Sequence, residues 1–207
     1  MADRVPLDFD PPARQLRSLL LGIGGRELAG PTPCEDWTVA ALLVHIMGIC
    51  AAFAHAARKL TGVPGTDGPP PAPNPAALPP YWRSRMPVLI EELAAAWRDP
   101  AAWTGTSQVG GVTMPAATIG AFGMSELVLH SWDLARATGQ DYAADPRILE
   151  ALVELLSQGP AGLFGPVVEY EDEGFLLDQV VALAGRDPRW RPGRHWDLSS
   201  PSTSVAE

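Results

Sequence analysis

Apolar residues recur at helical spacing along most of the chain. Leucine and isoleucine side chains separated by three or four positions predict an amphipathic helix over residues 11–24. A turn-rich stretch follows at 31–37, and Thr38 is placed to cap the next helix by accepting a hydrogen bond from a free backbone amide. That second helix is almost wholly apolar and is predicted to continue to about Lys59.

Proline and glycine set the limits of the following elements. Residues 61–80 hold eight prolines and three glycines, which predicts an extended loop or lid. A third helix is predicted over 84–98 from its helical spacing of apolar residues. Residues 101–115 fit a loop or a short hairpin, and a fourth helix is predicted over 116–137, closed by Gly139.

Two shorter helices are predicted near 145–158 and 174–184, and no long stretch alternates as a strand does. The expected fold class is therefore all-α: a bundle of four main helices with a proline-rich loop and short C-terminal helical additions. We expect residues 1–190 to form this bundle as one domain and residues 191–207 to form a loose tail.

Composition narrows the classes of partner. The chain has 15 basic and 24 acidic residues and a formal charge of −9, which disfavours binding to nucleic acid or to an anionic membrane surface. The segment Val39–Ala57 has no formally charged residue, but its polar and alanine content favours a buried helix over a membrane span. Two cysteines and a start without an apolar secretory core make the cytoplasm the expected compartment.

The fourth predicted helix carries an unusual polar stripe. Glu126 and His130 lie about 40° apart on a helical wheel, and Asp133 returns to within about 20° of Glu126. The helix is otherwise apolar nearly all round, which favours a central position where a buried carboxylate and imidazole need partners. The spacing leaves three interpretations open: a metal site, a hydrogen-bonded pair, or a solvated face.

His45 poses the same question on the second helix, where its neighbours are apolar. A lone histidine there is either a satisfied core residue or a ligand, and a bundle can direct it toward Glu126 and His130. Two imidazoles and one carboxylate would leave a further coordination position for water or substrate, as in catalytic zinc sites. Asp133 would then orient a ligand histidine from the second coordination sphere, unless it is solvent-exposed.

The other candidate residues have simpler interpretations. Trp37 and Trp132 are expected to be packing residues. Cys50 should point away from His45, and Cys34 is expected to be structural although it precedes a helix N-terminus. Neither of the two remaining histidines is expected to take part in the site: His55 and His195.

Several stretches resemble a known family when taken together. They are TPCEDWTV at 32–39 with LLVH at 42–45, ELVLHSWDLA at 126–135 with the Thr138–Gly139 pair, and LAGRDPRW at 183–190. The chain is similar in these stretches to actinobacterial DinB-like metal-binding proteins, a group that includes the N-terminal domain of mycothiol-dependent maleylpyruvate isomerase. The resemblance implies an up-down-down-up four-helix bundle and a divalent metal held by His45, Glu126 and His130.

The expected function follows from this resemblance. It implies a metal-dependent enzyme that uses a low-molecular-weight thiol such as mycothiol, together with an electrophilic substrate, for S-transfer or thiol-assisted isomerisation. Zinc is the expected metal, with nickel as the second choice, because mixed nitrogen and oxygen ligands suit both. The alternatives are a non-enzymatic metal-containing binding or sensing module and a bundle without metal. The oligomeric state stays open, a homodimer included.

Overall fold

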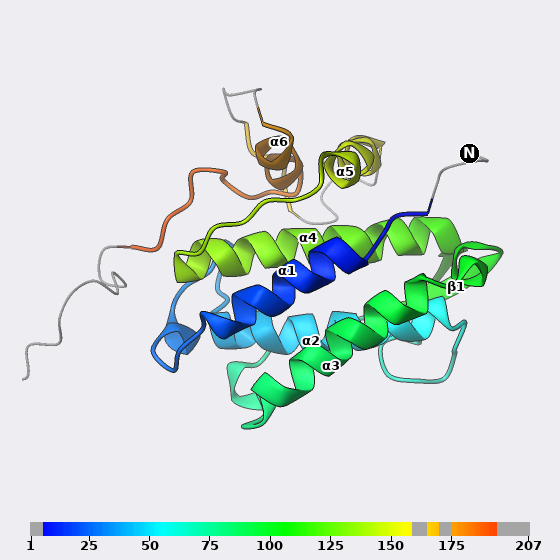
Figure 1. Cartoon of the computed structure of the whole chain (residues 1–207), viewed down its shortest axis with the longest axis horizontal. Helices are drawn as coiled ribbons and strands as arrows, with labels where there is room; N and C mark the ends of the chain where they lie inside the picture. Colours follow the sequence, from blue (N-terminus) through cyan, green and yellow to red (C-terminus); the bar gives the residue numbers. More distant parts are fainter. Residues whose placement is uncertain (1–5, 159–164, 170–174, 194–207) are drawn as a thin grey trace, which may run out of the picture.

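The computed structural model describes residues 6–158, 165–169 and 175–193. Four long helices dominate it: α1 (Asp10–Leu21), α2 (Val39–Ala57), α3 (Trp82–Trp97) and α4 (Ala116–Thr138). Helices α1 and α4 run in one direction, and α2 and α3 run in the other, so the bundle has the predicted up-down-down-up order (Figure 1). The predicted all-α class is confirmed.

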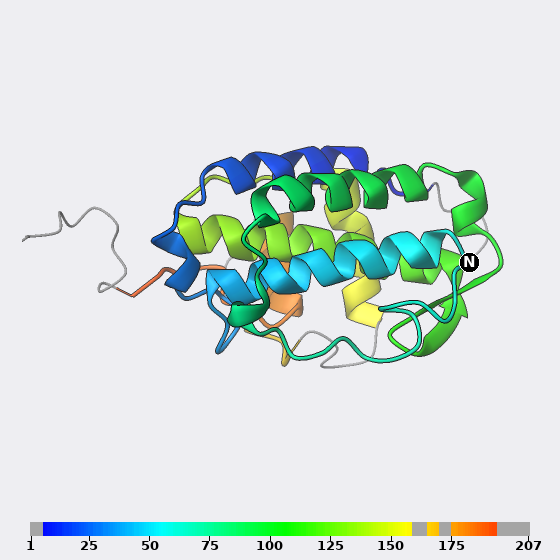
Figure 2. The ribbon, with the colours of Figure 1, turned by 90° about the horizontal axis from the view of Figure 1, so that it is seen from below.

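The four helices form two layers of two. Helices α1 and α2 each pack against both α3 and α4, which places α1 diagonally opposite α2. Figure 2 shows α1 beside α3 in one layer and α2 beside α4 in the other. The contact between α2 and α4 brings the two helices that carry the candidate ligands face to face.

Shorter elements join and cover the bundle. They are η1 (Glu27–Ala29), η2 (Pro75–Ala77), η3 (Pro100–Trp103), β1 (Thr106–Val109), β2 (Val112–Pro115), α5 (Pro146–Gln158) and α6 (Leu176–Leu183). The two strands pair antiparallel, so the hairpin alternative for this region is the correct one. Helices α5 and α6 pack on each other, and α5 packs against α4 (Figure 1).

Two helix boundaries differ from the prediction. Helix α1 ends at Leu21. Ile23, which was predicted to belong to the helix, lies after its end and is buried in the core. Helix α3 begins at Trp82 because that side chain is buried in the core, which leaves Pro87 within the helix rather than near its first turn. Tertiary packing therefore overrides the local signal at both positions. The predicted tail falls almost wholly outside the described residues, which end at 193.

Helix α2 is long and apolar enough to cross a membrane by length and composition, but 67% of its most apolar window is buried inside the bundle. This burial is consistent with a core helix of a soluble protein. Helix α4 is buried on nearly every face, as its composition predicted, and Gly139 closes it in the left-handed conformation at φ 66°. His130 and Asp133 of α4 are therefore buried in the interior, and Glu126 is partly exposed.

Thr38 caps α2 as predicted, because its hydroxyl accepts a hydrogen bond from the Ala41 amide at 3.2 Å. Replacing Thr38 by alanine is expected to lower the free energy of unfolding by about 1 kcal/mol, since that amide loses its acceptor. Urea denaturation of the purified chain measures this change. Thr38→Ser keeps a hydroxyl and is the control; an equal loss in both variants would contradict the capping role.

Candidate metal centre

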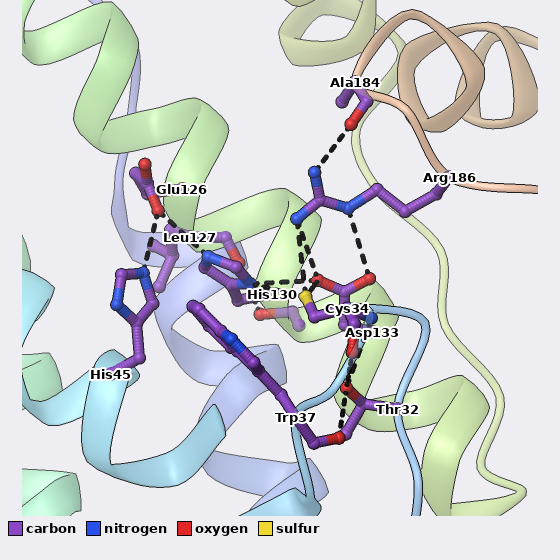
Figure 3. A network of polar contacts seen from close by, with 11 residues as sticks. Thr32, Cys34, Trp37, His45, Glu126, Leu127, His130, Asp133, Ala184 and Arg186 are labelled. Atoms are coloured by element: carbon purple, nitrogen blue, oxygen red, sulfur yellow. Dashed lines mark hydrogen bonds and ion pairs between the residues drawn. The ribbon is translucent and has the colours of Figure 1, made fainter. Parts of the chain in front are cut away.

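Three side chains from two facing helices meet in the bundle. His45 projects from the first half of α2, and Glu126 and His130 project from α4 one turn apart (Figure 3). Nε2 of His130 lies 3.0 Å from Oε2 of Glu126, and Nε2 of His45 lies 3.4 Å from the same oxygen. The structure thus brings together the three residues that the sequence predicted.

The spacing of these donor atoms suits a metal ion. One ligand atom from each of His45, Glu126 and His130 lies within 4.8 Å of the others. Donors about 2.0 to 2.1 Å from a tetrahedral zinc are about 3.3 Å apart, which is close to both contacts of the Glu126 oxygen. The His45 and Glu126 side chains keep 13% and 19% of their surface exposed, so solvent reaches this cluster.

Asp133 contacts His130 at Nδ1, the ring nitrogen that does not face Glu126. Its Oδ2 lies 2.9 Å from Nδ1 of His130, and its side chain is fully buried. An Nδ1–H that donates to this carboxylate leaves Nε2 facing Glu126 and His45. Of the two alternatives for Asp133, the hydrogen bond to His130 is therefore the one observed, and solvent exposure is not.

Arg186 is the residue of this cluster that the sequence did not single out. It follows α6, and its Nη2 and Nε donate to the two carboxylate oxygens of Asp133 at 3.2 and 3.4 Å (Figure 3). Its Nη1 donates to the Ala184 carbonyl at 2.7 Å. Arg186 lies within the 183–190 stretch that carries the family resemblance, which was the available signal.

Cys34 lies closer to the site than expected. Its thiol donates to Oδ2 of Asp133 at 3.1 Å and lies 3.9 Å from Nδ1 of His130. Cys34, His130 and Asp133 therefore form a second group with metal-ligand spacing. The guanidinium of Arg186 lies 3.6 Å from the Cys34 sulfur, and this positive charge makes the second group the poorer cation site.

The remaining candidates lie where their simpler interpretations placed them. Trp37 packs its ring against His45 at 4.9 Å and against His130 at 6.1 Å between centroids. Cys50 is buried in the core and belongs to neither group of potential metal ligands, and His55 makes its hydrogen bond to the Pro64 carbonyl. His195 lies outside the described residues.

Comparison with known families agrees with this architecture. Residues 9–135, more than half of the chain, match the family described as mycothiol maleylpyruvate isomerase N-terminal domain. The chain belongs to this family. The matched segment contains His45, Glu126, His130 and Asp133, but Arg186 lies beyond it.

Solved structures and a mycobacterial relative are similar to this family member over most of its length. A crystal structure of the mycothiol-dependent maleylpyruvate isomerase superposes with a TM-score of 0.61 at 21% identity, covering 86% of both chains. A mutant of that isomerase superposes with a TM-score of 0.55 at 20% identity over the same shares. These superpositions establish a shared fold. An uncharacterized Mycobacterium tuberculosis protein, Rv0738 in strain H37Rv, is 27% identical over 83% of this chain and 92% of its own length.

The contacts of Glu126 and His130 determine the ionisation states of these two side chains. Burial raises the pKa of Glu126, but hydrogen bonds from His130 and His45 outweigh it, so its pKa is lowered. Burial likewise opposes charge on His130, yet hydrogen bonds to Asp133, Cys34 and Glu126 raise its pKa well above the usual value. In the metal-free chain His130 is therefore a cation between two carboxylates, and metal binding at Nε2 must release its proton.

Asp133 and Cys34 complete the charge distribution. Burial raises the pKa of Asp133, but the charge of Arg186 and the hydrogen bond from His130 lower it overall. Burial raises the pKa of Cys34, so this thiol keeps its proton and acts as a donor. Together these effects hold Asp133 as a carboxylate that accepts hydrogen bonds from three side chains.

These shifts predict how the stability of the metal-free chain depends on pH. The raised pKa of His130 contributes stability that is fully present below its unfolded value of about 6.5 and is lost as pH rises through the folded pKa. The lowered pKa of Asp133 contributes stability that is present above its unfolded value of about 3.9 and is lost as pH falls. With EDTA present, urea midpoints should therefore decline from about pH 6.5 to 8 and also below about pH 4. A midpoint that rises between about pH 6.5 and 8 would contradict this assignment.

Proposed function

We propose that this protein is a divalent-metal-dependent enzyme that uses a low-molecular-weight thiol. The observation that supports it is the convergence of Nε2 of His45, Nε2 of His130 and Oε2 of Glu126 at one partly exposed place between α2 and α4. These three residues would hold the metal. Zinc is the proposed ion and nickel the second choice, because mixed nitrogen and oxygen donors suit both.

The chain's own residues would prepare the site for an anionic thiol. Asp133 would hold the Nδ1 proton of His130, which directs the Nε2 lone pair toward the ion. Glu126 is the only anionic ligand of the three, so the ligand set leaves one net positive charge with a divalent ion. When bound, the ion would supply Lewis acidity and would stabilise a thiolate at neutral pH.

The thiol and its partner substrate are inferred from the family. Its name and the solved relative both refer to mycothiol, so mycothiol is the proposed thiol and an electrophile is the proposed second substrate. The reaction would be an S-transfer or a thiol-assisted isomerisation. The cytoplasm is the proposed compartment, since thiols stay reduced there.

Elemental analysis of the purified chain tests the metal. We expect about one equivalent of zinc or nickel per chain after dialysis against metal-free buffer, as in other three-ligand sites. His55→Ala, a substitution on the same helix away from the cluster, should keep this equivalent. A chain that retains no divalent metal and binds none on titration would overturn the proposal.

Turnover tests the enzymatic part separately. Metal-loaded protein, mycothiol and a panel of electrophiles that includes maleylpyruvate should give thiol-dependent consumption or isomerisation of an electrophile. Glu126→Gln should abolish this turnover. A metal-loaded chain that binds the thiol but converts none of the electrophiles would instead be the binding or sensing module.

A further inference from the structure

A separate cavity lies beside the C-terminal end of α4. It is partly open to solvent, has a volume of about 390 Å³, and is lined by the end of α4, the loop that follows, the first turn of α6, and Pro188, Arg189 and Arg191. Figure 1 shows α6 and the chain that follows it on the same side of α4. The lining includes none of the residues of the candidate metal centre, and its volume is in the range of small-molecule sites.

The charge of this cavity departs from that of the chain. Its lining holds three guanidinium groups, from Arg136, Arg189 and Arg191, against the carboxylates of Asp141 and Asp178. The whole chain has 15 basic residues against 24 acidic ones. With Asp187 3.6 Å from Arg189, the cavity is close to neutral in a protein that is acidic elsewhere, and its guanidinium groups are well shaped to hold carboxylate or phosphate.

Arg136 is the fixed member of this group. Its guanidinium lies over the Trp132 ring, 5.4 Å from the centroid, and its Nη2 donates to the Pro188 carbonyl. Its Nε is buried and has no hydrogen-bond partner among the described residues. Burial and the charge of Arg191 lower the pKa of Arg136 and outweigh the opposing charges of Asp178 and Asp187, so a further anion would favour the charged guanidinium.

Other polar groups of the lining come from the chain after α6 and from the loop after α4. The Arg189 side chain is 80% exposed and its Nε lies 3.6 Å from Asp187, so little holds it in place. Arg191 donates to the adjacent Trp190 carbonyl and is likewise on the surface. Gln140 and Asp141 also line the cavity and offer oxygen acceptors, the Gln140 amide nitrogen being held by the Leu19 carbonyl and the Thr138 hydroxyl.

We propose that this cavity binds a small hydroxylated anion, with a carboxylate or phosphate group held by Arg136 and Arg191 and hydroxyl groups held by Gln140 and Asp141. Arg189 would close over the bound anion from the surface. The site is independent of the proposed metal and thiol chemistry, because it shares no residue with the metal centre.

Isothermal titration calorimetry on the full chain in EDTA tests this site, with glucose 6-phosphate, gluconate and neutral glucose as probes. At least one of the two anions should bind saturably with a Kd below about 1 mM, and glucose should not. A preference for one anion identifies phosphate or carboxylate as the recognised group. Absence of binding by both anions at about 10 mM, or equal binding of glucose, would overturn the proposal.

Variants locate the binding. Arg136→Gln and the surface substitution Arg191→Gln should each weaken the anion at least about tenfold, because each removes a charge-assisted hydrogen bond. Arg147→Gln, which removes the same charge at the start of α5, is the matched control and should bind as the parent does. An equal loss in Arg147→Gln, or no loss in Arg191→Gln, would overturn the assignment. Since no metal is present, either result leaves the metal proposal intact.

Discussion

Replacing His130 by alanine is expected to weaken zinc binding by more than about 100-fold, a larger loss than removal of an outer hydrogen-bond partner causes. His130 supplies one donor atom through Nε2, and through Nδ1 it is also the link to Asp133. Without it, Glu126 and His45 retain only two donors. Competition with a chromophoric chelator measures the affinity, and elemental analysis measures the occupancy.

The matched control for this experiment is His55→Ala. His55 lies on α2 as His45 does, but its ring contacts the Pro64 carbonyl rather than the cluster. Its zinc affinity should equal that of the parent chain, and both variants should show the parent's helical content by circular dichroism. If His130→Ala keeps one equivalent of zinc at the parental affinity, the ligand assignment is wrong.

Replacing Arg186 by methionine is expected to cost about 3 to 5 kcal/mol of unfolding free energy, because it leaves His130 as the one cation shared by the buried carboxylates of Asp133 and Glu126. Asp133 is fully buried and Arg186 is 7% exposed, so water can replace little of the lost interaction. Urea denaturation in EDTA measures the change without a contribution from metal binding.

Two further variants separate charge from packing. Arg189→Met removes the same group three residues later, where the side chain is 80% exposed, and should change the unfolding free energy by less than about 0.5 kcal/mol. Asp133→Asn in the Arg186→Met background should restore part of the loss, since it removes the buried charge. A loss below about 1 kcal/mol in Arg186→Met alone would show that Asp133 does not depend on this guanidinium.

Local sequence patterns predicted the helices well but their limits less well. Thr38 caps α2 and Gly139 closes α4 because each acts through backbone groups only a few residues away. The start of α3 was placed two residues too late, because the burial of Trp82, a property of the assembled bundle, adds another part of a turn before Pro87. Features that depend on neighbouring residues in the chain could be predicted from the sequence, and features that depend on tertiary packing could not.

The same distinction divides the site. Glu126, His130 and Asp133 share a helix, so helical geometry alone places them on one stripe. The convergence of His45 with them was predicted from the bundle and from the family resemblance. The contacts of Cys34 and Arg186 with Asp133 join residues 99 and 53 positions apart, and no periodicity in the sequence encodes such a meeting.

The matched family domain ends before the chain reaches Arg186, which contacts a buried residue of that domain. The recognised domain stops at residue 135, yet the cation that neutralises Asp133 enters from residue 186, after two more helices. A fragment that ends after α4 would keep His45, Glu126 and His130. It would lack Arg186, the guanidinium that contacts the buried carboxylate of Asp133. The segment after α4 therefore supplies a positive charge that stabilises the family domain, and a fragment cut at residue 135 would lack it.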